Sequence, residues 1–168
     1  MKRILILFII VLLVLLSGCT SNQSFREGIT CEDIMNAIID VTDHPEADKI
    51  YLKSQDNFDA FALSLWADGM YQECDDIALI DDYAIFVSAG TTTYEIAVLK
   101  TDTINSTDKL EALMSHRKQT LELGDKGMYD PKFDLRMSTS KTLTVGNFVL
   151  FIITDDNDAA LNAIEALQ

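Results

Sequence analysis

The sequence is poor in the residues that build several common classes of functional site. It has only two histidines and three cysteines among 168 residues, and after Lys2-Arg3 its longest basic cluster is Arg117-Lys118. Zinc sites usually draw on several histidine and cysteine ligands, and nucleic-acid surfaces need clustered Lys and Arg that neutralise phosphates. The composition therefore argues against a histidine-rich zinc centre and against a nucleic-acid partner.

Sequence motifs for catalysis and for cofactors are also lacking. There is no Walker loop, dinucleotide-binding glycine pattern, haem motif or HExxH sequence, so we expect no cofactor. Ser88 stands in Phe-Val-Ser-Ala-Gly, which lacks the first glycine of a nucleophile elbow, and we interpret it as a serine at the end of a strand. The motifs assign no catalytic, cofactor-binding or metal-binding residue.

What the sequence does have is a long apolar run near its N-terminus. Lys2 and Arg3 precede Ile4–Leu16, an uninterrupted stretch of 13 apolar residues that ends in two small residues. As a helix this run would rise about 20 Å, against a hydrocarbon core of roughly 30 Å. The layout predicts an export signal over residues 1–18, rather than a permanent membrane span.

The end of this signal, Leu16-Ser17-Gly18-Cys19, resembles the lipobox of bacterial lipoproteins. The resemblance implies that Cys19 receives a diacylglyceryl group and becomes the first residue of the mature chain. Two acyl chains anchor a protein stably, so we expect a lipoprotein on the extracytoplasmic face of the cell membrane. The alternative is an uncleaved anchor in which Cys19 is an ordinary thiol.

The rest of the chain is acidic and long enough for one domain. Loss of residues 1–18 leaves 11 Lys and Arg against 27 Asp and Glu, a formal charge of −16. Residues 19–28 are polar and predict a tether of at most about 35 Å, followed by one domain over residues 29–168. Because anionic headgroups would repel this domain, the membrane attachment must come from the lipid.

The order of predicted elements favours an α+β fold. A helix from Thr30 to Thr42 ends before Pro45, and a second helix follows Asp56 or Asn57, with Trp66 as a core residue. The remaining elements are an extended piece over 49–53, a hairpin of strands over 84–88 and 94–99, a helix from 105 or 106 to about 124 or 127, an irregular segment over 128–137, a second hairpin of strands over 142–145 and 148–154, and a helix that begins at 155–158.

The C-terminal half thus repeats the order strand, strand, helix after two initial helices. Antiparallel hairpins joined to helices favour one antiparallel sheet with the helices packed on one face. In the helix after residue 105 we expect Lys109, Arg117 and Lys118 to point outward. Leu110, Leu113, Met114 and Leu121 of the same helix are expected to point inward.

Several segments of the chain together carry a family resemblance. They are the first two helices, Ile80–Ser88, Tyr94–Lys100, the helix that bears Arg117, and Val145–Phe151. They resemble a family of exported lipoproteins of Gram-positive bacteria, known as domain of unknown function 4358. The resemblance covers residues 30–168, but Ala67–Tyr71 stands where such proteins carry a Tyr-Gly pair. It implies a lipoprotein location and this domain type, without a catalytic residue, substrate or cofactor.

The other two cysteines can be paired or free. Cys31 and Cys74 could form a disulfide in an exported protein, which would close a loop worth about 4 kcal/mol, or they could be free thiols. Cys31 lies near a helix N-terminus, which lowers a thiol pKa, but Glu32 and Asp33 oppose this effect. Cys74 stands among acids as well, so we do not expect a nucleophilic cysteine.

Acidic residues supply the remaining candidates. An acidic hydrolase site would require two or more of Asp75, Asp81, Glu95 and His116 to converge in a pocket. Calcium could bind where Asp75-Asp76 meets Asp81-Asp82, whereas we interpret Asp155, Asp156 and Asp158 as a helix cap, since they fail the EF-hand pattern. His44 is expected in a solvated proline turn.

The sequence therefore favours a membrane-anchored lipoprotein that acts as a non-enzymatic binding or accessory module. Its expected partners are the membrane, through the lipid on Cys19, and a protein or a wall-associated component. An exported hydrolase with an acidic site and a receptor for calcium or another small ligand are the alternatives.

Overall fold

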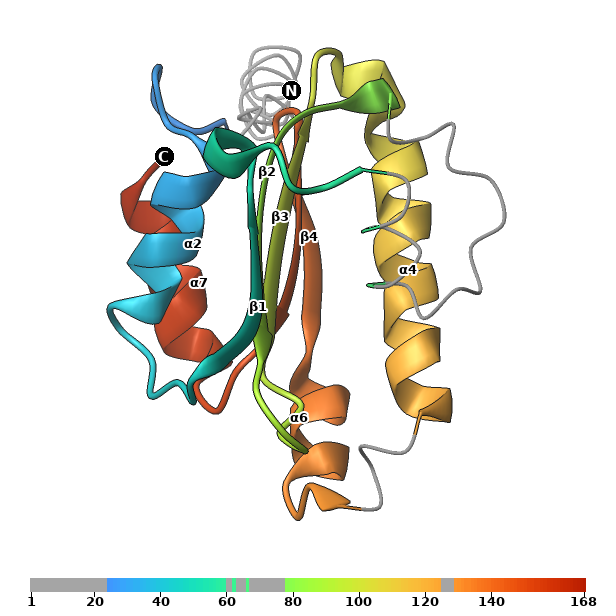
Figure 1. Ribbon diagram of the computed structural model, residues 1–168. Coiled ribbons are helices and arrows are strands. Elements are labelled where there is room, and N and C mark those ends of the chain that lie inside the picture. Colours follow the sequence, from blue (N-terminus) through green and yellow to red (C-terminus); the bar gives the residue numbers. More distant parts are fainter. Residues whose placement is uncertain (1–23, 60–61, 63–65, 67–77, 125–128) are drawn as a thin grey trace, which may run out of the picture.

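The computed structural model describes residues 24–59, 62, 66, 78–124 and 129–168. Their centre is a five-stranded antiparallel sheet (Figure 1). The strands are β1 (Ala47–Leu52), β2 (Ile80–Ser88), β3 (Glu95–Thr101), β4 (Lys141–Val145) and β5 (Phe148–Ile153), in the order β1-β2-β3-β5-β4. The predicted α+β class with an antiparallel sheet is confirmed.

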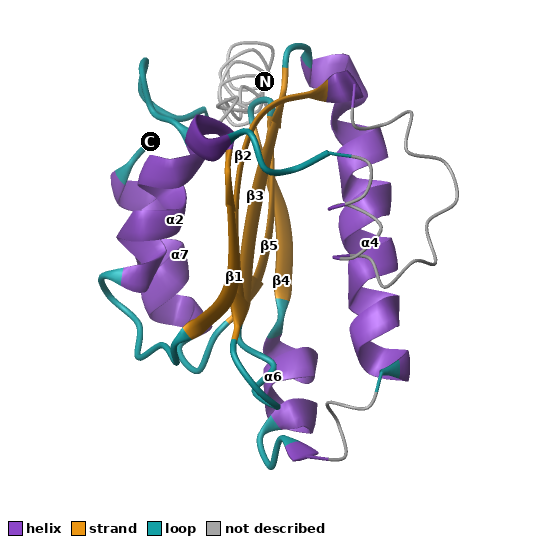
Figure 2. Ribbon diagram, in the orientation of Figure 1, coloured by secondary structure: helices purple, strands orange, loops and turns teal. Residues whose placement is uncertain are grey.

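Helices cover both faces of this sheet. Helices α2 (Cys31–Ile39) and α7 (Asn157–Ala166) pack on one face, and α4 (Thr107–Leu123) lies on the other (Figures 1 and 2). The prediction that the helices pack on one face is therefore wrong. The physical reason is that β3 and β5 carry apolar side chains at successive positions, so both of their faces must be shielded from water.

The pleat of the strands divides the core into two clusters. On β5, Val149, Phe151 and Ile153 point toward α4, whereas Phe148, Leu150 and Ile152 point toward α2 and α7. Strands β2 and β3 alternate in the same way. We call the two sides of the sheet the α4 face and the α2/α7 face.

The two helices of the α2/α7 face begin with side-chain caps. The hydroxyl of Thr30 accepts from the amide of Asp33 at 3.1 Å, and the Asp33 carboxylate accepts from the Thr30 amide at 2.9 Å, which is a capping box. Asp156 accepts from the amide of Ala159 at 2.9 Å at the start of α7. The predicted capping role of the acidic segment at 155–158 is confirmed.

Both predicted hairpins are present. β2 pairs with β3, and β4 pairs with β5 across a turn at Gly146, whose φ of 59° is in the left-handed region that glycine tolerates. The order strand, strand, helix recurs as β2-β3-α4 and β4-β5-α7. Most of the predicted second helix lies outside the described residues, but Phe58, Ala62 and Trp66 are buried in the cluster on the α4 face.

Two local predictions are wrong. Residues 128–137 are not irregular throughout, because α6 (Phe133–Thr139) begins after Pro131. The polar tether does not extend to residue 28, because Phe25 packs edge-on against Phe148 with ring centroids 5.0 Å apart. In addition, Arg26 donates to the carbonyls of Ala166 and Leu167 at the end of α7. The docked part of the chain therefore begins closer to Cys19 than the sequence predicts.

Candidate functional site

Several predicted site residues lie outside the described part of the chain. They are Cys19, Cys74, Asp75 and Asp76, so the lipidation site and half of the first acidic cluster have no structural account. Cys31 is described, and it is a buried free thiol rather than half of a disulfide. Burial and the neighbouring Asp82 carboxylate raise the pKa of the Cys31 thiol, which disfavours a nucleophilic role.

The candidate hydrolase residues that are described do not share a pocket. Asp81 is on the surface, where it forms an ion pair with Lys100 at 3.7 Å. Glu95 is buried against α4, and His116 lies half-buried on α4 itself. The hollows found among the described residues are lined by other side chains. For these three residues the convergence that a hydrolase site requires is not observed.

Glu95 instead forms a buried ion pair that the sequence did not predict. The guanidinium of Arg117 donates from Nε to Oε1 at 2.9 Å and from Nη2 to Oε2 at 2.6 Å, and Glu95 is only 1% exposed. Trp66 Nε1 donates to the same carboxylate at 2.8 Å, while Arg117 also donates to the Trp66 carbonyl. The prediction that Arg117 points outward is wrong.

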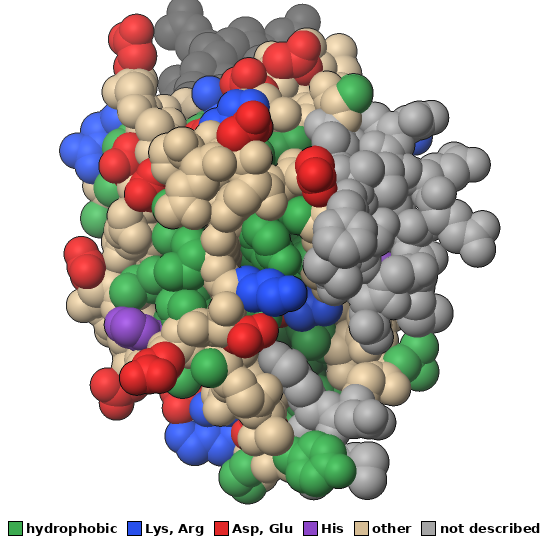
Figure 3. Space-filling model, in the orientation of Figure 1, with side chains coloured by type: hydrophobic (Ala, Val, Ile, Leu, Met, Phe, Trp, Pro, Cys, Tyr) green, Lys and Arg blue, Asp and Glu red, His purple; other side chains and the backbone are tan. Residues whose placement is uncertain are grey.

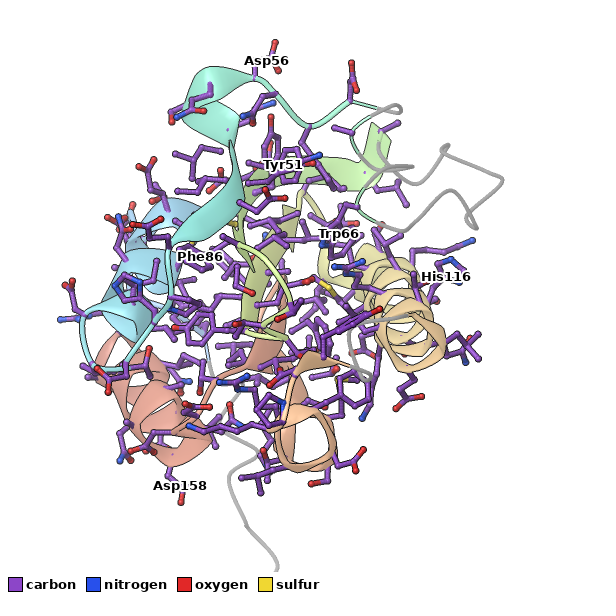
Figure 4. The ribbon with its side chains drawn as sticks, turned by 60° about the horizontal axis from the view of Figure 1, so that its bottom comes forward. Tyr51, Asp56, Trp66, Phe86, His116 and Asp158 are labelled. Carbon is purple, nitrogen blue, oxygen red and sulfur yellow. The ribbon has the colours of Figure 1, made fainter. Side chains whose placement is uncertain are left out.

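This arrangement holds structure together and is not built for proton transfer. Both carboxylate oxygens of Glu95 accept from fixed donors, and the guanidinium of Arg117 lies over the Trp66 ring, 5.6 Å from its centroid. A general base needs an oxygen that can reach a substrate proton. The pair therefore fastens Trp66 and helix α4 to β3, and Figure 4 shows Trp66 beside α4.

A second cluster of charges joins three parts of the chain that are far apart in sequence. Arg136 of α6 donates from Nη1 to Asp130 at 2.7 Å and from Nε to Asp155 at 2.6 Å. Asp130 also accepts from the amide of Thr93 at 2.8 Å, and Lys132 pairs with Asp155 at 2.7 Å. The cluster ties the loop after β2 to α6 and to the start of α7.

These contacts keep the groups ionised. Burial would raise the pKa of Asp130, but hydrogen bonds from Thr93, Lys132 and Arg136 outweigh it and lower that pKa below its ordinary value. Hydrogen bonding from Arg136 is the main cause that lowers the pKa of Asp155, and burial opposes it. For Arg136 burial opposes the charge, but the two carboxylates raise its pKa overall.

A surface hollow of about 240 Å³ lies beside this cluster, between α6 and the start of α7. A neighbouring hollow of about 450 Å³ extends toward the residues that follow α2. Asp155 and Asp156 line both, so the two hollows adjoin, and we refer to them together as the α6–α7 recess. Its other lining residues are Asp40, Val41, Thr42, Asp43, Leu135, Arg136, Thr139, Lys141, Thr154, Asn157 and Asp158.

The chemistry of the α6–α7 recess is that of a shallow acidic binding surface. Asp156 caps α7 and Asp155 is paired with Arg136 and Lys132, while Asp158 points away from the molecule (Figure 4). Within the described ranges, no three His, Cys, Asp or Glu are grouped so that they could hold a metal ion. Calcium binding at the first acidic cluster stays a prediction, because Asp75 and Asp76 are not described.

The remaining single candidates have ordinary structural roles. Ser88 ends β2 and donates to the carbonyl of Thr92 at 2.6 Å, as predicted for a strand-end serine. His44 is exposed in the loop after α2, where its ring lies edge-on against Phe86 at 5.8 Å. Asp82 accepts from the amide of Cys31 at 2.8 Å and so helps to begin α2.

Sequence reasoning missed both buried charge clusters, although signals for them exist. Arg117 stands at helical spacing from Leu110, Leu113, Met114 and Leu121, so it belongs to the apolar stripe of α4. Asp130 precedes a proline and then an amphipathic stretch, which is a typical helix start. A charge inside an apolar stripe indicates a buried partner.

Comparisons with known proteins complete the description of the site. Of the residues that the structure describes, none belongs to a helix with both the length and the hydrophobicity needed to cross a membrane. No protein-family model matches the sequence, and neither the curated proteins nor the solved structures searched contain a match.

Proposed function

We propose that this chain is a lipoprotein anchored through a diacylglyceryl group on Cys19 to the extracytoplasmic face of the cell membrane. Its α+β domain serves there as a non-enzymatic binding or accessory module for a protein or a wall-associated partner. The proposal includes the resemblance to domain of unknown function 4358, which rests on the segments quoted above. Nucleic acid is not among the proposed partners.

The observation that carries the proposal is the N-terminal sequence. Two basic residues, the apolar run Ile4–Leu16 and then Ser17-Gly18-Cys19 have the composition, the order and the spacing of a lipoprotein signal. Attachment by two acyl chains needs no basic surface, which suits a chain with a net charge of −14. Figure 3 shows acidic side chains spread over the surface in view.

The buried acids of the domain support binding rather than catalysis. Glu95 and Asp130 are buried and are saturated by donors from the protein itself, so they serve the fold. The α6–α7 recess, by contrast, is open to water and carries exposed acids. We therefore propose that a partner binds the described domain at this recess.

The anchor is tested by growing bacteria that express the full chain with radiolabelled palmitate. We expect label in the wild-type protein and retention of that protein in the membrane fraction. A Cys19→Ser variant should carry no label and should leave the membrane fraction or stay unprocessed. A Ser21→Cys variant of the Cys19→Ser chain tests whether position matters, and we expect it to remain unlabelled.

The binding role is tested by crosslinking on intact membranes followed by mass spectrometry. A photoreactive residue in place of Leu135, which is 63% exposed at the recess, should crosslink to a defined partner. The matched control places the same residue at Ile104, which is 59% exposed at the other end of the domain. Equal crosslinking at both positions, or turnover of a substrate by the purified chain, would contradict the binding role.

A further inference from the structure

The segment that follows the lipid anchor is fixed to one end of the domain. Phe25 packs against Phe148, the first residue of β5, and the amide of Arg26 donates to the Leu167 carbonyl at 3.1 Å. The Arg26 side chain adds a bond of 2.8 Å to the Ala166 carbonyl, which satisfies carbonyls that the end of α7 leaves open. We call this end of the domain the near pole.

The free length of chain between the anchor and the near pole is short. Only the five residues 20–24 separate Cys19 from Phe25. At roughly 3.3–3.6 Å for each residue step, the Cα atoms of Cys19 and Phe25 can be at most about 20 Å apart. A tether that ended at residue 28, as the sequence predicts, would have been much longer.

The α6–α7 recess lies at the opposite end of the same strand. β5 runs from Phe148 at the near pole to Ile153, and the residues that follow it, Thr154–Asp158, line the recess. At about 3.4 Å per residue, the seven steps from Phe148 to Asp155 span roughly 24 Å. Figure 1 shows the same separation, with α6 and the start of α7 at the bottom and the C-terminus, beside which Arg26 binds, toward the top.

Charge does not distinguish the two ends, because both expose acids. The far pole, defined by the α6–α7 recess, exposes five. The near pole exposes Glu27, Asp81 and Asp102. Anionic headgroups would repel both surfaces, so the covalent anchor and its short tether are what hold the near pole close to the membrane. The exposed acids of the far pole are Asp40, Asp43, Asp155, Asp156 and Asp158.

We infer that the near pole is the membrane-facing surface of this protein and that the α6–α7 recess faces away from the bilayer. The inference rests on the proposed lipid anchor. To turn the recess toward the membrane, the tether would have to run the length of the sheet, and about 20 Å of chain cannot do so. The outer leaflet is thus the partner of the near pole, and any ligand of the recess reaches it from the side away from the membrane.

The orientation is tested with the lipidated full chain in vesicles of phosphatidylcholine and phosphatidylglycerol that contain a headgroup-linked quencher. A fluorophore is attached through Asn105→Cys at the near pole or Asp158→Cys at the far pole, in a Cys74→Ser background. Both positions are exposed, and Asn105 follows the end of β3, where Lys100 pairs with Phe148. We expect the label at residue 105 to lose most of its fluorescence and the label at residue 158 to keep nearly all of it.

Two variants of the tether supply the controls. A flexible insertion after Ser21 lengthens the tether, and the double change Phe25→Ala and Arg26→Ala frees the docked segment. Both should narrow the difference between the two labels, the first more than the second. Equal quenching at residues 105 and 158 in the unaltered tether, or stronger quenching at 158, overturns the orientation.

The failure of the orientation and the failure of the anchor give different results. The intact mass of the purified protein is measured first, because a diacylglyceryl group on Cys19 adds a defined mass. A protein without this group, which does not bind vesicles, refutes the proposed function and the orientation with it. A lipidated protein that binds vesicles but quenches equally at both poles refutes only the orientation.

Discussion

The two faces of the sheet are stabilised in different ways. The α2/α7 face is an apolar cluster in which Cys31, Ile34 and Ile38 are fully buried against β2, β3 and β5. The α4 face is also largely apolar, but it contains the ion pair between Glu95 and Arg117. Removing the two charges from water costs free energy, and this cost offsets much of their mutual attraction. The ion pair therefore contributes little net stability, but it determines that Arg117 of α4 must meet Glu95 of β3.

The helices of the two faces differ as well. α2 and α7 both begin with a side chain that accepts from the first turn, whereas Ser106 makes no such hydrogen bond at the start of α4. Local signals thus define the helices of one face, and a long-range ion pair locates the helix of the other. The difference predicts that the two faces respond differently to substitution.

The largest effect is expected where the ion pair is broken on the α4 face. Arg117→Met leaves the Glu95 carboxylate buried without its cation, which should lower the free energy of unfolding by about 3–5 kcal/mol. Urea unfolding of the mature chain measures this loss. Lys100→Met is the matched control, because its ion pair with Asp81 is largely exposed and is worth about 0–1 kcal/mol.

A double variant decides whether the ion pair or the packing matters. Glu95→Leu combined with Arg117→Met removes both charges, so it should recover much of the stability that Arg117→Met loses. The single variant Glu95→Leu is measured as well. If the double variant loses as much stability as the two single variants added together, the charges contribute net stability, and the proposed difference between the two faces is wrong.

The next largest effect is expected in the apolar cluster of the α2/α7 face. Ile34→Ala removes methyl groups at a position with no exposed surface, and the resulting cavity should cost about 2–5 kcal/mol. Leu113→Ala, equally buried on α4, is the matched variant and should cost a similar amount. Urea midpoints of both variants test this, and a large gap between them would show that the faces also differ in their apolar packing.

A smaller effect is expected at the charge cluster of the far pole. Asp130→Asn loses the charged acceptor of Arg136, which should cost about 1.5–3 kcal/mol at neutral pH. Because folding lowers the pKa of Asp130 and of Asp155, the unfolded chain binds more protons in the acid range. The stability that these two groups contribute is complete above the unfolded pKa of about 3.9 and is lost as the pH falls through the lowered values.

The predicted loss of stability in acid is tested by measuring the free energy of unfolding between neutral and acid pH. The wild-type protein should lose stability as the solution is acidified, and Asp130→Asn should show a shallower loss. Asp134→Asn, at an exposed position in α6, serves as the control and should follow the wild-type curve. A wild-type chain whose stability rises on acidification would contradict the account.

The smallest effect is expected at the helix caps. Asp156→Ala removes the acceptor at the start of α7 and should cost about 0.5–2 kcal/mol. Ser106→Ala, at the start of α4, should cost less because its side chain makes no capping bond. Thermal unfolding of the two variants compares them directly, and an equal loss would remove this difference between the faces.

Much of the fold could be predicted because its signals are local. Gly146-Asn147 between apolar runs indicates a hairpin, and Thr30 and Asp156 indicate helix starts, as the structure confirms. The run Phe148–Ile153 also indicates that helices cover both faces of the sheet. It does not alternate between apolar and polar residues, and such a strand is buried on both faces.

The candidate site was less predictable because its contacts are not local. Glu95 and Arg117 are 22 residues apart, and Asp130 meets Thr93 across 37 residues, so no spacing rule joins them. Helix α6 was not predicted, because it is only seven residues long and no side-chain cap marks its start. The lipid anchor at Cys19 depends on an N-terminal pattern and stays a prediction.

The burial of Cys31 has a consequence for the reactivity of its thiol. Oxidants attack the thiolate, and both burial and the Asp82 carboxylate raise the pKa of this thiol and so keep it protonated. A sulfhydryl reagent can therefore reach residue 31 only when α2 lifts from the sheet. The rate at which such a reagent modifies Cys31 therefore measures how often this helix opens.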